Sequence, residues 1–180
     1  MQAEIYYDIL SNKQREILPC LGFLKERQIY LAGGTALALQ IGHRSSIDFD
    51  FYDKTEFELD TILRQFRQFF KKLSVIQMSN GTLIVDVEGI QVSVFYYDYK
   101  VIRPFFHTKH LLLLSLEDIS AMKLIAIIQR GERQALTYFE EAEGALPGSR
   151  IGIFNDRPGW GEVKEYLIKV VTEYKKEKVR

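Results

Sequence analysis

The sequence has little of what secreted or membrane-spanning proteins carry. Cys20 is the only cysteine among 180 residues, so the chain closes no internal disulfide. The longest apolar runs, 111–114 and 124–128, are far shorter than the ~20 residues that cross a bilayer, so we expect no membrane insertion. The opening residues MQAEIYYD contain acids where a signal peptide has a basic and then an apolar stretch. These features predict a cytoplasmic protein.

The chain also lacks net charge, because 24 Lys and Arg residues balance 24 Asp and Glu residues. This balance excludes a histone-like or polybasic protein, so any nucleic-acid partner needs a local site. Apolar residues make up 47% of the chain and charged residues 27%, which is typical of a folded protein. A chain of this length hides roughly 70% of its unfolded surface, enough for one sizeable core.

Hydrophobic periodicity predicts a mixture of helices and strands. Helical spacing predicts helices over residues 4–25, 36–41, 59–70 and 116–130. Alternating or short apolar runs predict strands over residues 28–31, 47–51, 73–78, 82–87 and 90–97. Pro19 should break the first helix, and the last three strands predict an antiparallel meander. Beyond Gly131 we expect two more helices, separated by a long loop.

The most informative stretch begins with a glycine pair, Gly33 and Gly34, at the junction of a predicted strand and helix. Consecutive glycines let backbone amides approach a ligand closely. The start of the following helix adds unpaired N–H groups and a positive dipole end, so the pair predicts a seat for phosphate. Thr35 is placed either to cap that helix or to contact the phosphate.

Thirteen residues separate the glycine pair from Asp48, and Asp48 and Asp50 stand at i and i+2 of a predicted strand and so share one face. Carboxylates ~5 Å apart repel by about 3 kcal/mol at an effective dielectric of about 20, and a divalent cation removes that penalty. Mg²⁺ prefers carboxylate and phosphate oxygens together. Taken alone, a pair of glycines is most often a plain turn, and an alternating acidic strand is most often a solvated sheet face. Together they predict metal-assisted attack on a nucleotide phosphate.

This spacing resembles the pattern of the polymerase-beta-like nucleotidyltransferases: a hydrophobic residue, Gly, Gly or Ser, about a dozen residues, then Asp, hydrophobic, Asp or Glu, hydrophobic. Those places fall on 32–34 and 48–51. The intervening run 43–46, His-Arg-Ser-Ser, narrows the resemblance to the abortive-infection toxin nucleotidyltransferases of the AbiEii/AbiGii-like family. Segments 80–95 and 115–124 look like that family's central sheet and signature helix.

The resemblance implies an α+β (α/β) nucleotidyltransferase fold, with a small mixed sheet flanked by helices. It places the nucleotidyltransferase core at residues 1–115 and a C-terminal helical part, packed on the core, at 116–180. It implies that Asp48 and Asp50 hold the metal and act in catalysis together with Lys123. The implied nucleotide-binding residues are Gly33, Gly34, Thr35, Arg44 and Ser46.

The implied activity is that of a metal-dependent, type IV toxin-like nucleotidyltransferase. It would use Mg²⁺ or Mn²⁺ and an NTP, with tRNA or a protein as the acceptor and a cognate antitoxin as a partner. A lysine on the only polar seam of a buried helix needs an anionic partner, so a salt bridge from Lys123 to Asp48 or Asp50 is an alternative to a catalytic role.

Two departures from the family pattern favour an alternative, a catalytically degenerate module that binds a nucleotide or a partner. Many nucleotidyltransferases carry a third carboxylate on a neighbouring strand, where this chain has Ser93. Asp86, Glu88 and Asp98 are candidate substitutes. After Arg133 the chain lacks an acidic helical segment that the family usually has, which indicates an internal deletion.

Other interpretations explain less of the sequence. His107 and His110 have the spacing of metal ligands, but we expect ordinary surface histidines and assign no zinc. The residues around the aspartate pair do not fit a haloacid-dehalogenase phosphatase. A glycosyltransferase of the Asp-x-Asp type stays open, although it leaves the glycine pair and Lys123 unexplained. A structural protein would need the turn, the strand and the lysine helix to coincide by chance.

Overall fold

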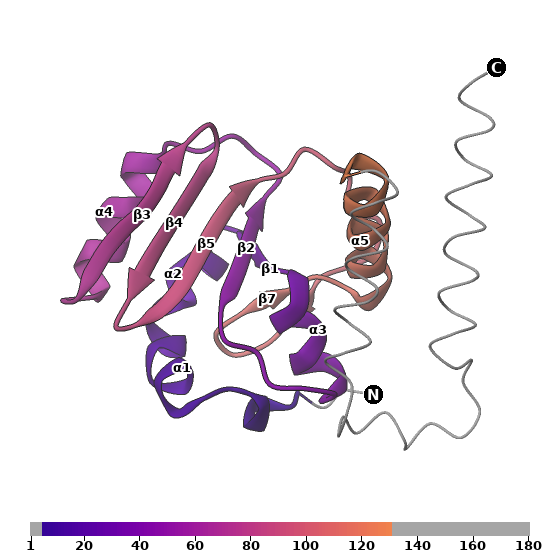
Figure 1. Ribbon diagram of the computed structural model, residues 1–180, viewed down its shortest axis with the longest axis horizontal. Helices are drawn as coiled ribbons and strands as arrows, with labels where there is room; N and C mark the ends of the chain where they lie inside the picture. Colours follow the sequence, from indigo (N-terminus) through magenta and orange to yellow (C-terminus); the bar gives the residue numbers. More distant parts are fainter. Residues whose placement is uncertain (1–4, 131–180) are drawn as a thin grey trace. The chain divides into compact units, whose positions relative to one another are not determined.

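The structure, a computed structural model, describes residues 5–130 (Figure 1). The chain divides into two compact units, Met1–Ile119 and Ser120–Arg180, of which the first contains the whole sheet. The elements predicted beyond Gly131 lie outside the described residues, and the division into 1–115 and 116–180 stays a prediction. Between residues 5 and 130, no helix combines the length and the apolar character that a membrane span needs.

Seven strands form one mixed sheet with the order β3-β4-β5-β2-β1-β7-β6. The strands are β1 (Tyr30–Leu31), β2 (Phe49–Asp53), β3 (Leu73–Ser79), β4 (Thr82–Val87), β5 (Ile90–Tyr96), β6 (Phe106–His107) and β7 (Leu112–Leu113). The predicted antiparallel meander is confirmed as β3, β4 and β5. β2 pairs parallel with β5 and antiparallel with β1, so it lies inside the sheet rather than at an edge.

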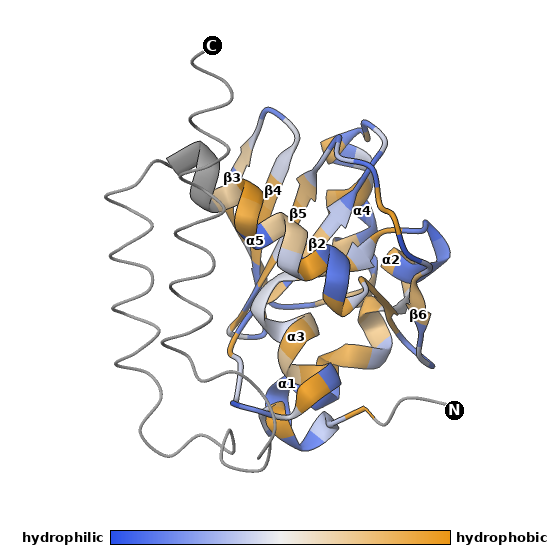
Figure 2. Cartoon of the chain, turned by 90° about the vertical axis from the view of Figure 1, so that its right-hand side faces the viewer, coloured by the Kyte–Doolittle hydropathy of each residue, from blue (hydrophilic) through white to orange (hydrophobic). Residues whose placement is uncertain are grey.

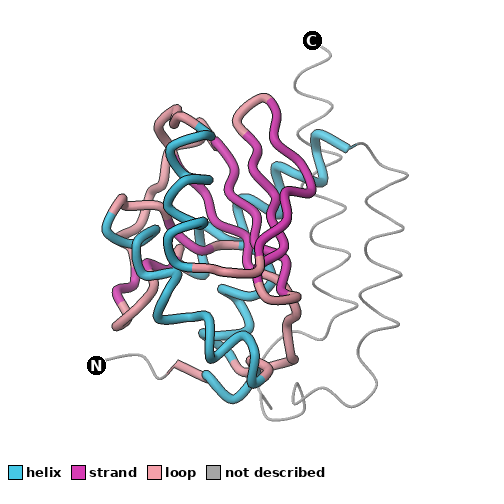
Figure 3. The backbone as a smooth tube through the Cα atoms, turned by 90° about the vertical axis from the view of Figure 1, so that its left-hand side faces the viewer, coloured by secondary structure: helices cyan, strands magenta, loops and turns pink. Residues whose placement is uncertain are grey.

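Two short helices precede β1, one helix lies between β1 and β2 and one between β2 and β3, and the last follows β7; helices are cyan in Figure 3. They are α1 (Asn12–Ile17), α2 (Gly22–Glu26), α3 (Gly33–Ile41), α4 (Leu59–Phe69) and α5 (Leu116–Arg130). A 3₁₀ turn that contains Pro19 separates α1 from α2, which confirms the predicted break. The first helix begins at Asn12, later than predicted, because Ser11 and Gln14 form a reciprocal capping box that fixes its start.

Two short strands, β6 and β7, were not predicted. β7 lies inside the apolar run 111–114, where four buried residues give no period from which a strand can be recognised. The turn between β6 and β7 is fixed by Thr108, whose N–H and hydroxyl both donate to the carbonyl of Leu111. β7 then pairs parallel with β1, with Leu31 opposite Leu113.

Alternation along β2 separates a core face from a site face. Phe49 and Phe51 point to the core face and are at most 1% exposed, whereas Asp50 and Tyr52 point to the site face and are half-buried. On the core side, α4 packs against β3 and β4 and buries Phe66. Figure 2 shows hydrophobic residues along the strands and α3, and mainly hydrophilic ones at the turns.

The Phe66 ring is an anchor of α4, and it meets the Phe23 ring edge-on at 5.1 Å. We expect Phe66→Ala to lower the free energy of unfolding by about 3–5 kcal/mol, because the cavity left inside the core does not refill. Phe69→Ala is the matched control. Phe69 stacks on Phe23 but is 48% exposed, so its loss should cost about 1 kcal/mol. Urea unfolding measures both, and equal losses would contradict this packing.

Asp118 fastens the loop before β6 to the start of α5. Its carboxylate accepts hydrogen bonds from the backbone N–H of Ile102 (3.0 Å), the N–H of Arg103 (2.9 Å) and the hydroxyl of Ser115 (2.8 Å). Burial alone would raise the pKa of Asp118, but these hydrogen bonds and the charge of Arg103 outweigh it and lower the pKa below its usual value. The predicted entry of a helix at this point is confirmed.

This anchor makes the stability of the fold depend on pH. A lowered carboxyl pKa stabilises the fold fully above the unfolded value of about 3.9, and the effect is lost as the pH falls through the folded value. We expect Asp118→Asn to be less stable by about 1–3 kcal/mol at neutral pH. The difference in the free energy of unfolding between the variant and the wild type should narrow below about pH 4. A gap that stays constant into strong acid, in thermal unfolding scans, would contradict an ionised anchor.

Candidate active site

The glycine turn and the acidic strand are in contact. Gly33 begins α3 with φ +67°, a conformation that favours glycine. A Cβ at this position would lie 3.1 Å from Oδ2 of Asp50, and the N–H of Ala32 donates to the carbonyl of Asp50 (3.0 Å). The backbone conformation therefore favours glycine at residue 33, and a larger residue would displace the Asp50 carboxylate by a few tenths of an ångström.

The start of α3 is free of capping side chains. Ala32 is the N-cap and makes no side-chain cap, and the first intrahelical bond runs from the N–H of Ala36 to Ala32. The N–H groups of residues 33–35 precede that bond and point out of the helix end. With the positive end of the helix dipole, they form the kind of surface that binds a phosphate.

Arg44 supplies a positive charge at this helix end. Its guanidinium occupies the space where a Cβ of Gly34 would lie, and it donates to the carbonyl of Ser45 (3.0 Å). Burial and the Arg44 charge lower the pKa of the neighbouring His43, so the histidine adds no charge at neutral pH. The structure thus brings Gly33, Gly34 and Arg44 together, and their role in nucleotide binding stays a prediction.

Hydrogen bonds of Thr35 and Ser46 connect α3 to the residues just before β2. The Thr35 hydroxyl lies 2.6 Å from the Ser46 hydroxyl and 2.6 Å from the carbonyl of Asp48. A hydroxyl has one proton, so Thr35 donates to the carbonyl and accepts from Ser46. Both residues are buried, at 1% and 5% exposed. A direct contact with nucleotide would break these bonds, and that role stays a prediction.

The two aspartates flank the first residue of β2. Asp48 lies just before the strand, which begins at Phe49 rather than at residue 47, and Asp50 lies within it. Both side chains are half-buried. Burial, and after it the charge of Asp50 and more weakly that of Asp48, raise the pKa of Tyr52. Both carboxylates therefore lie close enough to the Tyr52 hydroxyl to affect its ionisation.

Tyr52 is a site residue that sequence analysis missed. It follows Asp50 by two residues on the same face of β2, and its ring packs against Tyr97 (5.6 Å, edge-on) and Phe95 (5.3 Å). Tyr30 lies on its other side at 6.1 Å. The alternation Asp-x-Asp-x-Tyr could have revealed this residue, because a period of two continues the acidic face.

A serine, Ser93, and not a third carboxylate lies beside Asp50 on the neighbouring strand β5. The parallel register places Ser93 directly opposite Asp50. Asp86 pairs with Gln91 on the far side of β5, and its carboxylate accepts from the N–H of Gly89 (2.9 Å). Across residues 5–130 no cluster of three or more acidic, histidine or cysteine side chains could hold a metal ion. Asp86 therefore does not complete the pair.

The other candidate acids also lie elsewhere. Glu88 is in the β4–β5 turn, where its carboxylate accepts from the N–H of Lys72 (3.2 Å). Asp98 follows the end of β5 and is exposed. Lys123 belongs to the second unit, where its side chain is exposed, and the polar seam expected along its helix stays a prediction. Its role in the active site stays a prediction.

The contact between Gly33 and Asp50 predicts different outcomes for two neighbouring substitutions. Gly33→Ala should lower the free energy of unfolding by about 1–3 kcal/mol, since it strains the backbone and displaces a carboxylate. Gly34→Ala meets only the flexible end of Arg44 and should stay within about 1 kcal/mol of wild type. Thermal unfolding of both variants tests the geometry, and a Gly33→Ala protein as stable as Gly34→Ala would contradict it.

Comparison with known proteins gives one family match and one close relative. The model of the AbiEii toxin family, a nucleotidyl transferase of type IV toxin–antitoxin systems, matches residues 23–136. An uncharacterised protein of Aquifex aeolicus (strain VF5) is 30% identical over 210 aligned positions, covering 92% of this chain and 97% of the relative. Because the alignment is longer than the 180-residue chain, that relative has residues with no counterpart here.

Two solved structures are more distant. JHP933 of Helicobacter pylori is 18% identical, with a TM-score of 0.47, and the match covers 66% of this chain and 59% of that one. TM1012 of Thermotoga maritima is 20% identical, with a TM-score of 0.47, and the match covers 74% of this chain and 89% of that one. This chain therefore spans 59% of the length of JHP933.

The matched range contains the whole candidate site. It includes the glycine turn, both aspartates, the meander and α5, and it ends just beyond Arg133, where the sequence departs from the family pattern. The open alternative of an Asp-x-Asp glycosyltransferase explains neither the glycine pair nor the length of this match. The chain belongs to the AbiEii nucleotidyltransferase toxin family of type IV toxin–antitoxin systems.

Proposed function

We propose that this chain is a metal-dependent nucleotidyltransferase that transfers a nucleotidyl group from an NTP to a hydroxyl of tRNA or of a protein. The observation that carries the proposal is the contact of Gly33 with the Asp50 carboxylate. An anion bound at the start of α3 would lie beside a cation held by Asp50. A nucleoside triphosphate with Mg²⁺ or Mn²⁺ has that combination of charges.

The glycine turn, Arg44 and the two aspartates each have a role in this reaction. The N–H groups of Gly33 and Gly34 would bind the triphosphate, and Arg44 would compensate its charge. Asp48 and Asp50 are oxygen ligands of the type that Mg²⁺ prefers, and the hydrogen bond from the Thr35 hydroxyl to the Asp48 carbonyl holds Asp48 in place. The bound metal would neutralise charge that develops on the phosphate oxygens.

The reaction forms a bond between the acceptor oxygen and the α-phosphorus and breaks the bond to the leaving pyrophosphate, while the proton of the acceptor hydroxyl passes to water. Two carboxylates leave most of the metal's coordination positions to substrate oxygens and water. The site would therefore bind metal weakly by itself and firmly together with the nucleotide. We place the reaction in the cytoplasm, with a cognate antitoxin as the partner that restrains it.

A second candidate function rests on Ser93. A serine opposite Asp50 removes the carboxylate that usually acts as a base toward the acceptor. The alternative is therefore a degenerate module that binds a nucleotide or a partner protein without transfer. It predicts that an NTP with Mg²⁺ raises the unfolding temperature but leaves no label on any acceptor.

The test incubates the full chain with labelled NTPs, Mg²⁺ and total tRNA or cell protein. We expect transfer of label, and a fall of at least about 100-fold in Asp50→Asn, because a metal ligand is lost. Asp60→Asn is a matched control, since Asp60 is exposed on the first turn of α4. Absence of transfer with Mg²⁺ and with Mn²⁺ by the folded protein, alongside nucleotide binding, would favour the degenerate module.

A further inference from the structure

The strand β3 is an open edge of the sheet. It ends the strand order, so within residues 5–130 only β4 pairs with it. Every residue of Ser74–Ser79 is exposed. Three of them are large and apolar: Val75 is 41% exposed, Ile76 57% and Met78 36%. An edge strand with exposed apolar side chains is a template for pairing with another strand.

The composition of β3 favours a strand like itself as the partner. The segment Leu73–Ser79 contains no charged residue and no proline, the residues that commonly block edge pairing. A bulge at Ile76 interrupts the ladder to β4. On either side of the bulge, 73–75 and 77–79 are regular and of equal length. Antiparallel pairing of two copies about Ile76 would place each regular segment against the other.

Two lysines precede β3, beside Glu88 of the neighbouring turn, and three acidic residues lie near its other end. Lys71 and Lys72, both exposed, precede the strand. The other end borders a cavity of about 660 Å³ whose lining includes Met78, Asn80 and Gly81. The same cavity is lined by three acids and by no basic residue: Glu56, Glu58 and Asp60.

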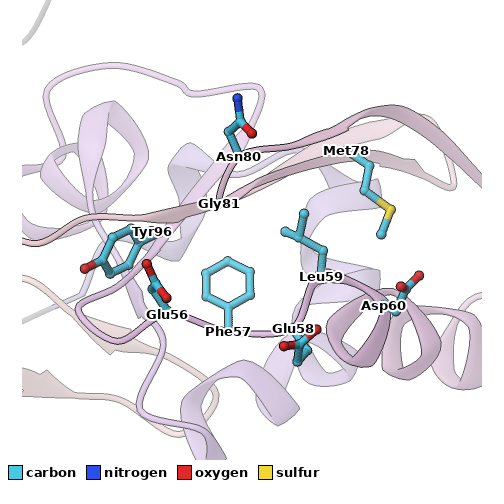
Figure 4. Close-up of a pocket in the computed structure, with 9 residues that line it drawn as sticks. All are labelled: Glu56, Phe57, Glu58, Leu59, Asp60, Met78, Asn80, Gly81 and Tyr96. Carbon is cyan, nitrogen blue, oxygen red and sulfur yellow. The ribbon is translucent and has the colours of Figure 1, made fainter.

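Figure 4 shows how this cavity is built. The β3–β4 hairpin lies on one side of it, and the segment that leads into α4 lies on the other. The Phe57 ring rises between the two, and the Glu56 carboxylate lies beside Tyr96. The charge of Glu56 contributes, after burial and Asp98, to raising the pKa of Tyr96, which agrees with this placement.

Pairing about Ile76 aligns these opposite ends. In that register residue 73 of one copy lies opposite residue 79 of the other, so Lys71 and Lys72 of one copy lie beside the β3–β4 turn, residues 80 and 81, of the other. Residues 80 and 81 line the acidic cavity. Neighbouring strands are about 4.8 Å apart, so the lysines of one copy would reach the acids of its partner. The two-fold axis repeats this contact at both ends.

We propose that two copies of this chain form a symmetric dimer by antiparallel pairing of β3, with Lys71 and Lys72 of each copy against the acidic cavity of the other. The two seven-stranded sheets then continue as one. Ile76 meets its own counterpart at the axis, and Val75 and Met78 lose contact with water. The dimer is independent of the proposed nucleotidyl transfer.

The first experiment measures the mass of the full chain in solution by sedimentation over a wide range of concentrations. We expect twice the monomer mass of 21.0 kDa. Ile76→Lys should give the monomer mass, because two like charges would meet at the axis. Ile76 is 57% exposed, so circular dichroism should show an intact fold. A wild-type protein that stays monomeric, or a folded Ile76→Lys protein that stays dimeric, overturns the proposal.

The second experiment tests the register by exchanging charges. The Lys71→Glu/Lys72→Glu variant and the Glu56→Lys/Glu58→Lys variant should each be monomeric, since like charges meet at both ends. Mixed in equal amounts, the two variants should form a dimer, because each end again joins opposite charges. The Lys13→Glu/Lys109→Glu variant, reversed at two other exposed positions, should dimerise like wild type. A mixture that stays monomeric overturns the register.

Discussion

The contact between Gly33 and the Asp50 carboxylate is the constraint on which the site depends. It favours a residue without a Cβ at the start of α3, and it requires β2 to pass close beneath that helix end. The hydrogen bonds of Thr35 to Asp48 and Ser46 add a second connection between the same two elements. The start of α3 and two carboxylates are thereby held in one place by groups that need no ligand to stay there.

Much of the fold followed from residue patterns. The helices and the meander were predictable because their apolar residues recur at 3.6 or at 2 over many positions. β6 and β7, with two residues each, are too short to show a period, and their pairing depends on partners far away in sequence. The position of β2 between β1 and β5 is likewise a tertiary outcome that local spacing does not determine.

The candidate site was predictable to a similar extent. The motif identified the glycines, the aspartates and Arg44, because each belongs to a fixed spacing. It did not reveal Tyr52, whose place depends on aromatic packing with Tyr30 and Tyr97. It also could not tell that the hydroxyls of Thr35 and Ser46 bond to the protein itself. Sequence spacing selects which residues meet, whereas burial and available partners decide what each polar group contacts.

The parallel pairing of β2 with β5 has a consequence for the order of folding. It closes residues 54–89 into a loop, which costs more chain entropy than the tight turns of the meander. Contacts between segments close in sequence, such as the strands of the meander, form faster than contacts between distant segments. We therefore expect β3, β4 and β5 to assemble first and β2 to join them afterwards. Asp50 then reaches Ser93 late in folding, so a partly folded chain has its carboxylates but not yet the site.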